Sequence, residues 1–310
     1  MRTTMKSLTA LGLGCALALG NVGCIKKMIL EGTIESTRKA SAAVDTLSDY
    51  EVANAAAFAG LAQFEGMHYL APDNENALFL LTKGWTGATF AFIEDQMEQA
   101  EDAEDIMSPL YLYQQARARA GYDRAVHYGI ELLEHKAAGF EEAKKNDDTM
   151  KAWLANFEDA ETDAPNLFWA GYAWIARVNT AKDEPAMVSE LFVGVAMMER
   201  SVALDEQYLY GSGHTILGAY HARSPMAELD QAKAHFDKAL AISAGRTLLP
   251  KMQLAAKYYC AKGDKENYMK SLNEVLEAGD VFPQQRLSNM LAKRRAKRYL
   301  SEVRMKGCGF

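Results

Sequence analysis

Hydrophobic positions along most of the chain recur every three to four residues, the spacing that gathers them on one face of an α-helix. The stretch from Asp49 to Leu70 shows this pattern and stops at Ala71-Pro72-Asp73-Asn74, and a second stretch runs from Glu75 to Glu104. Proline and small polar residues between periodic stretches are typical of helix boundaries. The pattern therefore predicts an all-α fold of long helices joined by short turns.

The clearest repeat unit runs from Ala232 to Ile242, where the small residues Ala232 and Ala239 flank Phe236. Small residues let a partner helix approach closely, and an aromatic ring fills the groove between them. Similar units recur around Ser201 and Ser271, at intervals that bracket the roughly 34-residue period of tetratricopeptide repeats. Residues 49–310 are therefore predicted to form a tetratricopeptide-like solenoid of antiparallel helix hairpins with degenerate repeats.

Two stretches need a separate interpretation. The segments Leu110–Ala120 and Tyr122–His135 are predicted to pair as a hairpin around Gly121, because glycine often marks a turn. The charged stretch 139–163 contains no proline, and we expect it to form an inserted helix that packs across the array.

The ends of the array carry runs of one charge. Pro283 to Lys306 combines an apolar stripe with eight basic residues, and we interpret it as a capping helix with a polar outer face, which the end of a solenoid needs. Attraction to anionic lipid headgroups or to an acidic partner is the alternative. The acidic run from Glu94 to Asp105 lacks the turn of a calcium loop. We expect a solvated helix end there, with a docking face for a basic partner as the alternative.

The first 23 residues have the pattern of a leader. Arg2 and Lys6 precede an uncharged run from Ser7 to Gly23, and Cys24 follows, which is typical of a secretory signal peptide. Cys24 lies where bacterial lipoproteins are acylated and is the predicted lipidation site, with Cys15 as a rival and an unmodified Cys24 as the other alternative. More than one acyl chain gives stable membrane attachment. We therefore expect residues 24–48 to form a tether and first helix.

Export to the periplasm raises the question of a disulfide, because that compartment is oxidising. Cys260 and Cys308 are the two cysteines left in the mature chain. We favour a buried Cys260 and a free Cys308 in the tail, and a bridge between them is the alternative.

Composition and motifs exclude several classes of function. Of 310 residues, 49% are hydrophobic, and 34 Lys plus Arg stand against 41 Asp plus Glu. A large core is therefore possible, and the net charge of −7 disfavours nucleic-acid binding. Gly211-Ser212-Gly213 lacks the spacing of a hydrolase elbow. The chain also lacks phosphate-binding glycine loops and a third ligand for His214 and His221. No catalytic residue, metal or cofactor is predicted.

The aromatic load is the most informative chemical feature. Aromatic residues are concentrated on the first helices of the predicted hairpins, which line the concave face or bore of such an array. Most are expected in the core, and the rest are expected to wall an apolar cavity, since ligand pockets are largely apolar with a few polar anchors. The candidate cavity residues are Trp85, Phe92, Tyr111, Trp169, Trp174 and Tyr220, and the candidate polar anchors are Arg117, Arg119 and His214.

Short segments spread in order over nearly the whole mature chain carry a family resemblance. They include Ala71-Pro-Asp-Asn-Glu75, Lys83-Gly-Trp-Thr-Gly-Ala-Thr-Phe-Ala-Phe-Ile-Glu94, Leu167-Phe-Trp-Ala-Gly171, Ala234-His-Phe236 and Arg286-Leu-Ser-Asn289. As a set, they resemble the lipoprotein-like T components of tripartite, ATP-independent periplasmic (TRAP) transport systems, the TatT-like family.

The resemblance implies a non-enzymatic periplasmic lipoprotein that forms a homo-oligomer, a trimer, and docks the solute-binding P component of a TRAP system. It also implies a pore or cleft through each subunit, suited to a hydrophobic small molecule with or without an acidic group. Lys26 rather than Asp after Ile25 favours the outer membrane. The alternative is a general tetratricopeptide-like envelope scaffold that binds proteins without a small-molecule ligand.

Overall fold

The computed structural model describes residues 26–223 and 227–310, and all regular structure in these ranges is helical. The predicted all-α class is thus confirmed for this part of the chain. The expected signal peptide, residues 1–23, and the expected lipidation site, Cys24, lie outside the described residues. No helix within the described ranges is both long and apolar enough to cross a bilayer.

The N-terminal helices begin and end where the sequence places their caps. Residues 26–40 are helical and are followed by η1 (Ser41–Thr46), α2 (Tyr50–Leu70) and α3 (Glu75–Ala88). The side chain of Asp49 accepts a hydrogen bond from the backbone N–H of Val52 at 2.9 Å, and Asn74 does the same for Ala77 at 3.1 Å. Such caps satisfy backbone donors that have no partner in the first turn. The short turn between α2 and α3 makes them antiparallel.

The next two helices form long rods. A π-helical turn, η2 (Thr89–Ile93), joins α3 to α4 (Glu94–Ala103), and α5 (Pro109–Lys136) follows as a single helix. The predicted hairpin around Gly121 is therefore wrong. A Cβ on Gly121 would lie 2.2 Å from Oγ1 of Thr89, so this glycine permits close contact between α5 and η2 and does not make a turn.

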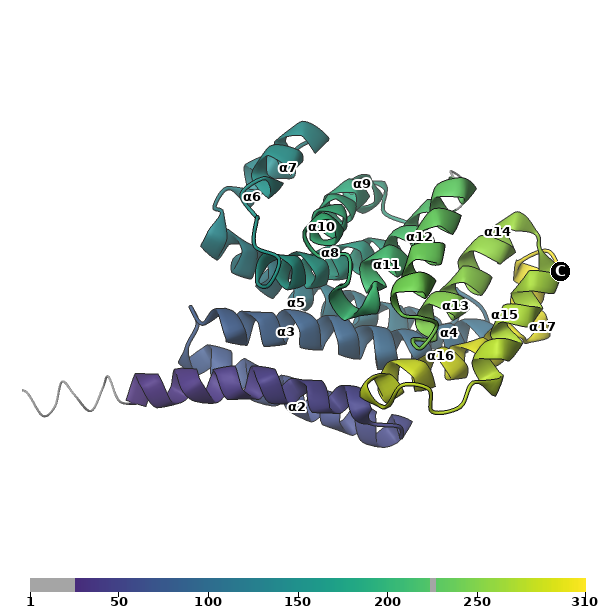
Figure 1. Cartoon of the computed structure of the whole chain (residues 1–310), viewed down its shortest axis with the longest axis horizontal. Coiled ribbons are helices and arrows are strands. Elements are labelled where there is room, and N and C mark those ends of the chain that lie inside the picture. The colour runs from purple at the N-terminus through teal and green to yellow at the C-terminus, as the bar shows by residue number, and fades with distance from the viewer. Residues whose placement is uncertain (1–25, 224–226) are drawn as a thin grey trace, which may run out of the picture.

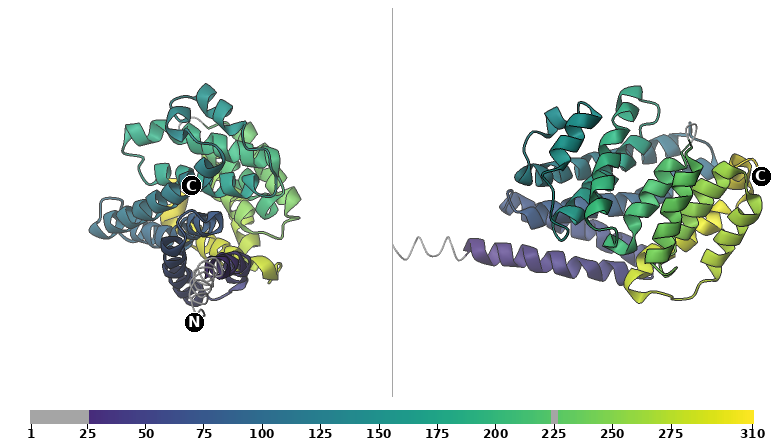
Figure 2. Two further views of the ribbon diagram at one scale, coloured as in Figure 1. Left: turned by 90° about the vertical axis from the view of Figure 1, so that its left-hand side faces the viewer. Right: turned by 45° about the horizontal axis from the view of Figure 1, so that its top comes forward.

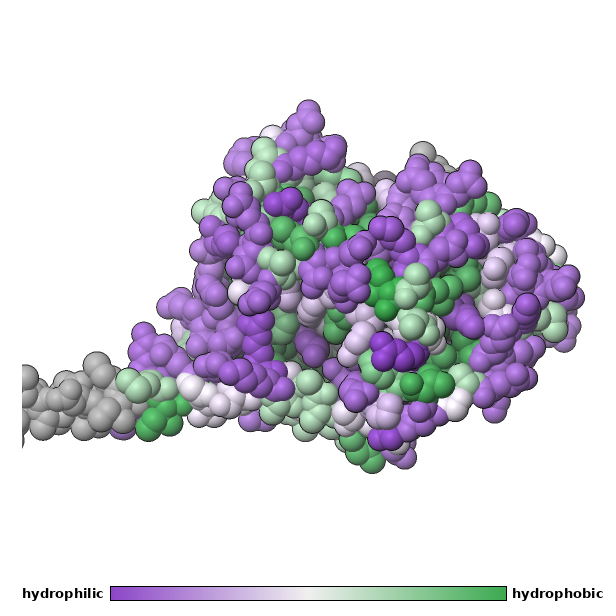
Figure 3. All heavy atoms as spheres, in the orientation of Figure 1, coloured by the Kyte–Doolittle hydropathy of each residue, from purple (hydrophilic) through white to green (hydrophobic). Residues whose placement is uncertain are grey.

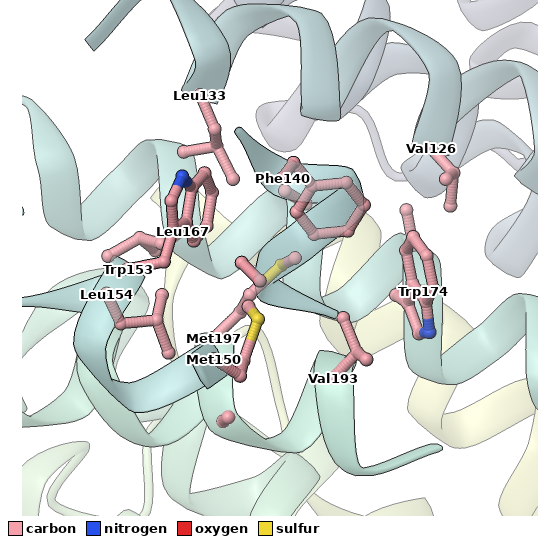
Figure 4. Close-up of a cluster of buried hydrophobic side chains, with 14 of the residues drawn as sticks. Val126, Leu133, Phe140, Met150, Trp153, Leu154, Leu167, Trp174, Val193 and Met197 are labelled. Atoms are coloured by element: carbon pink, nitrogen blue, oxygen red, sulfur yellow. The ribbon is translucent and has the colours of Figure 1, made fainter. Parts of the chain in front are cut away.

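The charged insertion is not a single helix. It forms α6 (Phe140–Ala143) and α7 (Asp147–Leu154), separated by a turn that Asn146 and Thr149 cap reciprocally. Figure 4 shows Phe140, Trp153 and Leu154 directed toward the core side chains of the neighbouring helices. The apolar anchors of this stretch thus pack as expected, while the reciprocal cap divides it.

The central helices pack as close pairs. These are α8 (Asp163–Asn179), the short α9 (Pro185–Ser189) and α10 (Leu191–Leu204), followed by η3 (Tyr208–Tyr210), α11 (Ser212–His221) and α12 (Leu229–Ile242). A Cβ on Gly171 of α8 would lie 2.9 Å from the carbonyl oxygen of Gly194 in α10. Backbones approach this closely only where side chains are absent.

The repeat unit on α12 packs as its sequence predicts. Ala232, Phe236 and Ala239 have no exposed surface. A Cβ on Gly218 of α11 would lie 3.0 Å from the ring of Phe236. The aromatic ring therefore fills the space that small residues leave between the two helices.

The C-terminal helices return to the start of the array. They are α13 (Leu249–Gln253), η4 (Leu254–Tyr259), α14 (Cys260–Lys262), α15 (Lys265–Glu277), η5 (Pro283–Gln285), α16 (Arg286–Tyr299) and α17 (Glu302–Gly307). Helix α16 packs on α13 and α15, and it also contacts η1 and α2. Figures 1 and 2 show these yellow helices beside the purple end of α2. The two ends of the array therefore meet.

Cys260 and Cys308 form a disulfide with Cα atoms 5.0 Å apart, which corrects the expectation of a free tail cysteine. The apolar end of the tail packs against α15, where the ring of the partly buried Phe310 lies 5.2 Å from that of Tyr268. This packing brings α17 beside α14.

Candidate functional site

A cavity of about 1650 Å³ lies inside the closed array. Its walls come from both ends and the middle of the chain, including α3, α4, α8, α11, η4 and α16. Figure 3 shows a recess near the middle of one face, bordered by both hydrophilic and hydrophobic residues. The cavity is larger than the roughly 300–1,000 Å³ typical of small-molecule sites.

Four of the six candidate cavity residues line this space: Phe92, Tyr111, Trp169 and Tyr220. Other aromatic residues that share it were not singled out as site candidates, among them Phe64, Phe168, Tyr172 and Phe192. A signal for Tyr172 was present in the sequence, because it follows Trp169 by three residues and such positions share a helix face. The two rings are stacked, with centroids 6.2 Å apart.

Trp85 lies outside the lining and takes part in a polar cluster between α2 and α5. Its Nε1 donates to Oε1 of Glu65 at 2.8 Å. The same carboxylate accepts hydrogen bonds from Arg124 at 2.5 and 2.6 Å and from Tyr128 at 2.7 Å. Burial favours the neutral form of Glu65, but these three hydrogen-bonding partners outweigh it and lower its pKa to about 2.

Trp174 belongs to the core that anchors the insertion. It is 2% exposed and its Nε1 donates to the carbonyl oxygen of Glu190 at 2.9 Å. Figure 4 shows its ring among Val126, Phe140 and Val193. Trp174 therefore belongs to the hydrophobic core and not to the cavity lining.

The three candidate polar anchors also lie outside the lining. Arg117 donates to Gln96 at 3.0 Å and to Gln114 at 2.7 Å, and Arg119 pairs with Glu184 at 2.6 Å. The ring of His214 lies between α11 and α12.

His214 belongs to a cluster of three imidazoles. Its Nδ1 is 2.9 Å from Nδ1 of His235, and the rings of His221 and His235 are stacked 5.4 Å apart. Burial, followed by the neighbouring charges of His214 and His221, lowers the pKa of His235 to about 4. The cluster stabilises the neutral form of His235 at the packing face behind the cavity wall.

The cavity has one strongly polar end, formed by α4, α16 and η4. Glu94 accepts a hydrogen bond from the hydroxyl of Tyr122 at 2.8 Å, and its other oxygen is 3.7 Å from Arg295. Arg295 is also 3.7 Å from Glu98, and Lys257 lies nearby in the lining. Burial raises the pKa of Glu94 despite the nearby Arg295 cation. The chemistry available here is charge recognition in an otherwise apolar space.

Behind this polar end, the acidic run on α4 pairs with the basic C-terminal helices. We call these contacts the α4–C-terminal seam, and it comprises Asp95, Glu98, Glu101 and Asp102 with Arg294, Arg295, Arg298 and Arg304. Asp95 has no exposed surface and Arg295 is only 2% exposed. The expected solvated acidic helix end is therefore wrong for these four carboxylates, whereas Arg294 and Lys297 of α16 keep exposed surface, as in the capping helix with a polar outer face that the sequence predicts. Each run neutralises the other.

One mouth of the cavity is rimmed by exposed apolar side chains. Ile106, Met107 and Leu112 come from the turn before α5 and its first turn, and Val188 comes from α9. The exposed fractions of Ile106 and Met107 are 53% and 73%. Contiguous exposed apolar residues often mark interaction or ligand-entry sites.

Comparison with known proteins gives one family match. No curated protein matches the chain. The family described as TRAP transporter T-component matches residues 46–305, which includes α2 to α16 and most of the residues that line the cavity. By this match the chain belongs to the TRAP transporter T-component family, whose members act as accessories in TRAP transport.

Proposed function

We propose that the protein is a lipid-anchored periplasmic T component that holds a hydrophobic small molecule in its cavity and docks the solute-binding protein of its TRAP system. The observation that carries the ligand part is the hollow itself. Its wall is dominated by apolar and aromatic side chains, and the charged runs of α4 and of the C-terminal helices pair with each other beside it. An apolar ligand would gain the free energy of leaving water on entering such a space.

The architecture we infer is the tetratricopeptide-like solenoid. The packing of Phe236 against Gly218, and of Gly171 against Gly194, supports this interpretation because both depend on small residues at hairpin contacts. A general scaffold without a ligand is the competing function, and it does not require a large hollow. We therefore place the ligand-binding function first.

A cavity-filling variant tests the ligand site. Gly87 lies on α3 in the cavity lining, and a Cβ there would meet nothing within 4 Å. Gly87→Phe should occupy part of the hollow and weaken binding of the neutral fluorescent probe N-phenyl-1-naphthylamine by about tenfold, equivalent to about 1.4 kcal/mol. Gly66→Phe is the matched control, because Gly66 also sits in a helix with an open Cβ position but outside the lining.

The two variants give opposite expectations for fluorescence titration. Loss of probe binding in Gly87→Phe, with normal binding in Gly66→Phe, supports the cavity as the ligand site. Equal binding in both variants and the native protein contradicts it. Native mass spectrometry that finds a co-purifying lipid or fatty acid gives independent support.

Docking of the solute-binding protein is proposed to use the apolar rim. Met107→Asp should weaken binding to the solute-binding protein of the same TRAP system, because it places a charge in the contact. Tyr69→Asp is the control, since Tyr69 is 87% exposed and lies outside the lining. Isothermal titration calorimetry measures both, and an unchanged affinity for Met107→Asp contradicts docking through the rim.

The membrane anchor and oligomer belong to the same proposal. Acyl-chain labelling of the native protein, with loss of label in Cys24→Ser, is expected for a lipoprotein anchored in the outer membrane. Label that persists in the variant contradicts anchoring at Cys24. A trimeric mass by analytical ultracentrifugation is expected for the oligomer that the family resemblance implies, and a monomeric mass contradicts it.

A further inference from the structure

One end of the molecule gathers exposed apolar side chains. Among residues 26–223 and 227–310, four of the five most exposed large hydrophobic side chains are Met28, Ile29, Tyr69 and Leu70, with exposed fractions of 70%, 63%, 87% and 66%. The first two lie in the first turn of the helix at residues 26–40, and the other two lie in the last turn of α2. We call these four side chains the N-terminal tip.

Packing between the two helices brings the tip together. Leu30 and Ala71, the residues next to Ile29 and Leu70, pack against one buried cluster that contains Ile34 and Met67. Because each residue adds about 1.5 Å along a helix, the four side chains lie within about two turns of each other along the helix axes. Figure 1 shows the N-terminal helix beginning at the left end of the molecule, and Figure 3 shows hydrophobic residues on the surface there. The tip is therefore one local surface and not four scattered residues.

The helix at residues 26–40 is fixed to the body of the protein. Ile34 has no exposed surface. Nη1 of Arg38 donates to Oδ1 of Asn76 at 2.8 Å, and the guanidinium of Arg38 stacks on the ring of Phe79 at 3.8 Å. Whatever the tip contacts therefore sets the direction of the whole array.

The position of the tip in the chain indicates its partner. Lys26 follows the proposed lipidation site, Cys24, by two residues, which span at most about 7 Å. Acyl chains on Cys24 would therefore enter a bilayer beside the tip. Tyrosine is enriched at the interface between lipid and water, and lysine is attracted to anionic headgroups. A protein partner is disfavoured, because a stable protein–protein interface involves about 20–30 residues on each side.

The charges beside the tip suit a lipid surface. Lys26 and Lys27 are exposed, and the contact of Lys27 with Glu31 at 3.8 Å leaves 78% of the lysine side chain exposed. Asp73, in the turn after α2, is also exposed and opposes the attraction to anionic lipid. The apolar side chains must therefore supply most of the contact, while the two lysines favour anionic headgroups.

We propose that the N-terminal tip is a membrane-contact surface, with Met28, Ile29, Tyr69 and Leu70 in the interfacial layer of a phospholipid bilayer. This inference rests on the proposed anchor at Cys24. The helix at residues 26–40 and α2 then stand end-on to the membrane, and the array projects away from it in one direction. An anchor without this contact does not fix that direction.

Lipid quenching of a fluorescent label tests the contact. Cys24 carries the proposed anchor and Cys260 is bridged to Cys308, so an introduced cysteine is the only free thiol once the leader is removed. Tyr69→Cys is labelled with the fluorophore NBD, and the acylated protein is reconstituted into vesicles of phosphatidylethanolamine and phosphatidylglycerol. A phosphatidylcholine with a nitroxide near the top of one acyl chain should quench this label at least about threefold more than a label on Val281→Cys.

Val281 is the matched position because its side chain is also apolar and exposed, at 42%. It precedes η5, which packs on η1 at the other end of the N-terminal helix. Tyr69 is a stricter test than Ile29, since it lies on another helix and is not held near the bilayer by an adjacent anchor. In the Tyr69→Cys chain, Leu70→Asp should reduce the quenching by about threefold, whereas Val52→Asp, at the opposite end of α2, should leave it unchanged.

Equal quenching at positions 69 and 281 overturns the proposal, and quenching that Leu70→Asp leaves unchanged contradicts an apolar contact. A label at position 69 that emits at shorter wavelength but is not quenched by the nitroxide lipid also overturns it, because that result indicates a second copy of the chain on the tip. Acyl-chain labelling of Cys24 separates this inference from the anchor. If the native protein incorporates the acyl label but the label on Tyr69→Cys is not quenched, the anchor stands and only the membrane contact fails. If the native protein incorporates no acyl label, the anchor fails and this inference fails with it.

Discussion

Asp95 is the centre of the α4–C-terminal seam, and its removal is the most direct test of how the array is closed. Its carboxylate accepts hydrogen bonds from Nε of Arg294 and Nη1 of Arg298, each at 2.7 Å. Gln99 donates at 2.7 Å and the hydroxyl of Tyr50 at 3.2 Å. One side chain therefore connects α2, α4 and α16.

The expected cost of Asp95→Ala follows from burial. Asp95 has no exposed surface, and the side chain of Arg298 is only 11% exposed. Removing one partner of a buried pair leaves an uncompensated charge and typically costs about 3–5 kcal/mol. The exposed pair of Lys233 and Asp237, with N–O distances of 2.8 Å, is the control. Asp237→Ala should change stability by less than about 1 kcal/mol because exposed pairs contribute little.

Urea unfolding followed by far-ultraviolet circular dichroism measures both variants. The m value should stay near that of the native protein if the same surface is exposed on unfolding. A loss below about 1 kcal/mol for Asp95→Ala, or equal losses for the two variants, refutes the view that the seam is a main stabilising element.

The pH dependence gives a second test of Asp95. Burial opposes ionisation, but the hydrogen bonds from Arg294 and Arg298 outweigh it, so the pKa of Asp95 in the folded protein lies below its ordinary value of 3.8. The unfolded chain then binds a proton more readily than the folded protein. The stabilisation is present above pH 3.8 and is lost as the pH falls through the folded pKa. Asp95→Ala should lack this acid-dependent component.

Three further predictions concern other parts of the structure. Gly121→Ala should lower the free energy of unfolding by about 1–3 kcal/mol, because its new methyl group clashes with Thr89. Gly66→Ala, at an open helical position, should raise the free energy of unfolding by about 0.5–1 kcal/mol. Thermal unfolding compares the two variants, and equal effects contradict the close approach of α5 and η2. Reducing the Cys260–Cys308 disulfide, or replacing both residues by serine, should lower the free energy of unfolding by about 2–4 kcal/mol. The reason is that the unfolded chain is no longer constrained by a closed loop with a sequence separation of 48. Identical urea unfolding curves with and without dithiothreitol contradict this prediction. Since the pKa of His235 is lowered from 6.5 to about 4 in the folded protein, the free energy of unfolding should decline as the pH falls from 6.5 toward 4. His235→Gln should make the free energy of unfolding depend less on pH over this range. An unchanged pH dependence in the variant contradicts the view that the cluster keeps His235 neutral.

The sequence predicts local elements well because their determinants are local. Asp49 and Asn74 cap the helices that the hydrophobic pattern defines. The small residue Ala232 and the aromatic residue Phe236 indicate a closely packed helix pair, and both are buried. Gly121 was misinterpreted because a glycine needed for close contact and a glycine needed for a turn look alike in one sequence. The partner that distinguishes them, Thr89, lies on another helix.

The candidate site was predictable to a similar extent. Phe92, Tyr111, Trp169 and Tyr220 line the cavity, whereas Trp85 and Trp174 do not. Both of the latter donate an indole N–H, to Glu65 and to the carbonyl of Glu190, and aromatic composition alone contains no information about such partners. Lys257 was not found because a single lysine in an amphipathic stretch is ordinary.

The charged runs show why closure of the array was the hardest feature to infer. The sequence presents an acidic face on α4 and a basic face on α16 and α17, and each face repels itself when taken alone. The connecting hydrogen bonds span sequence separations of about two hundred residues, as for Arg298 and Asp95 at 203. Pairing the two faces removes both repulsions and fixes the distance between the array's ends. Beside the seam, Leu287 and Leu291 of α16 pack with Leu61 and Phe92 in one buried apolar cluster, so charge pairs and apolar packing together join the ends around the cavity.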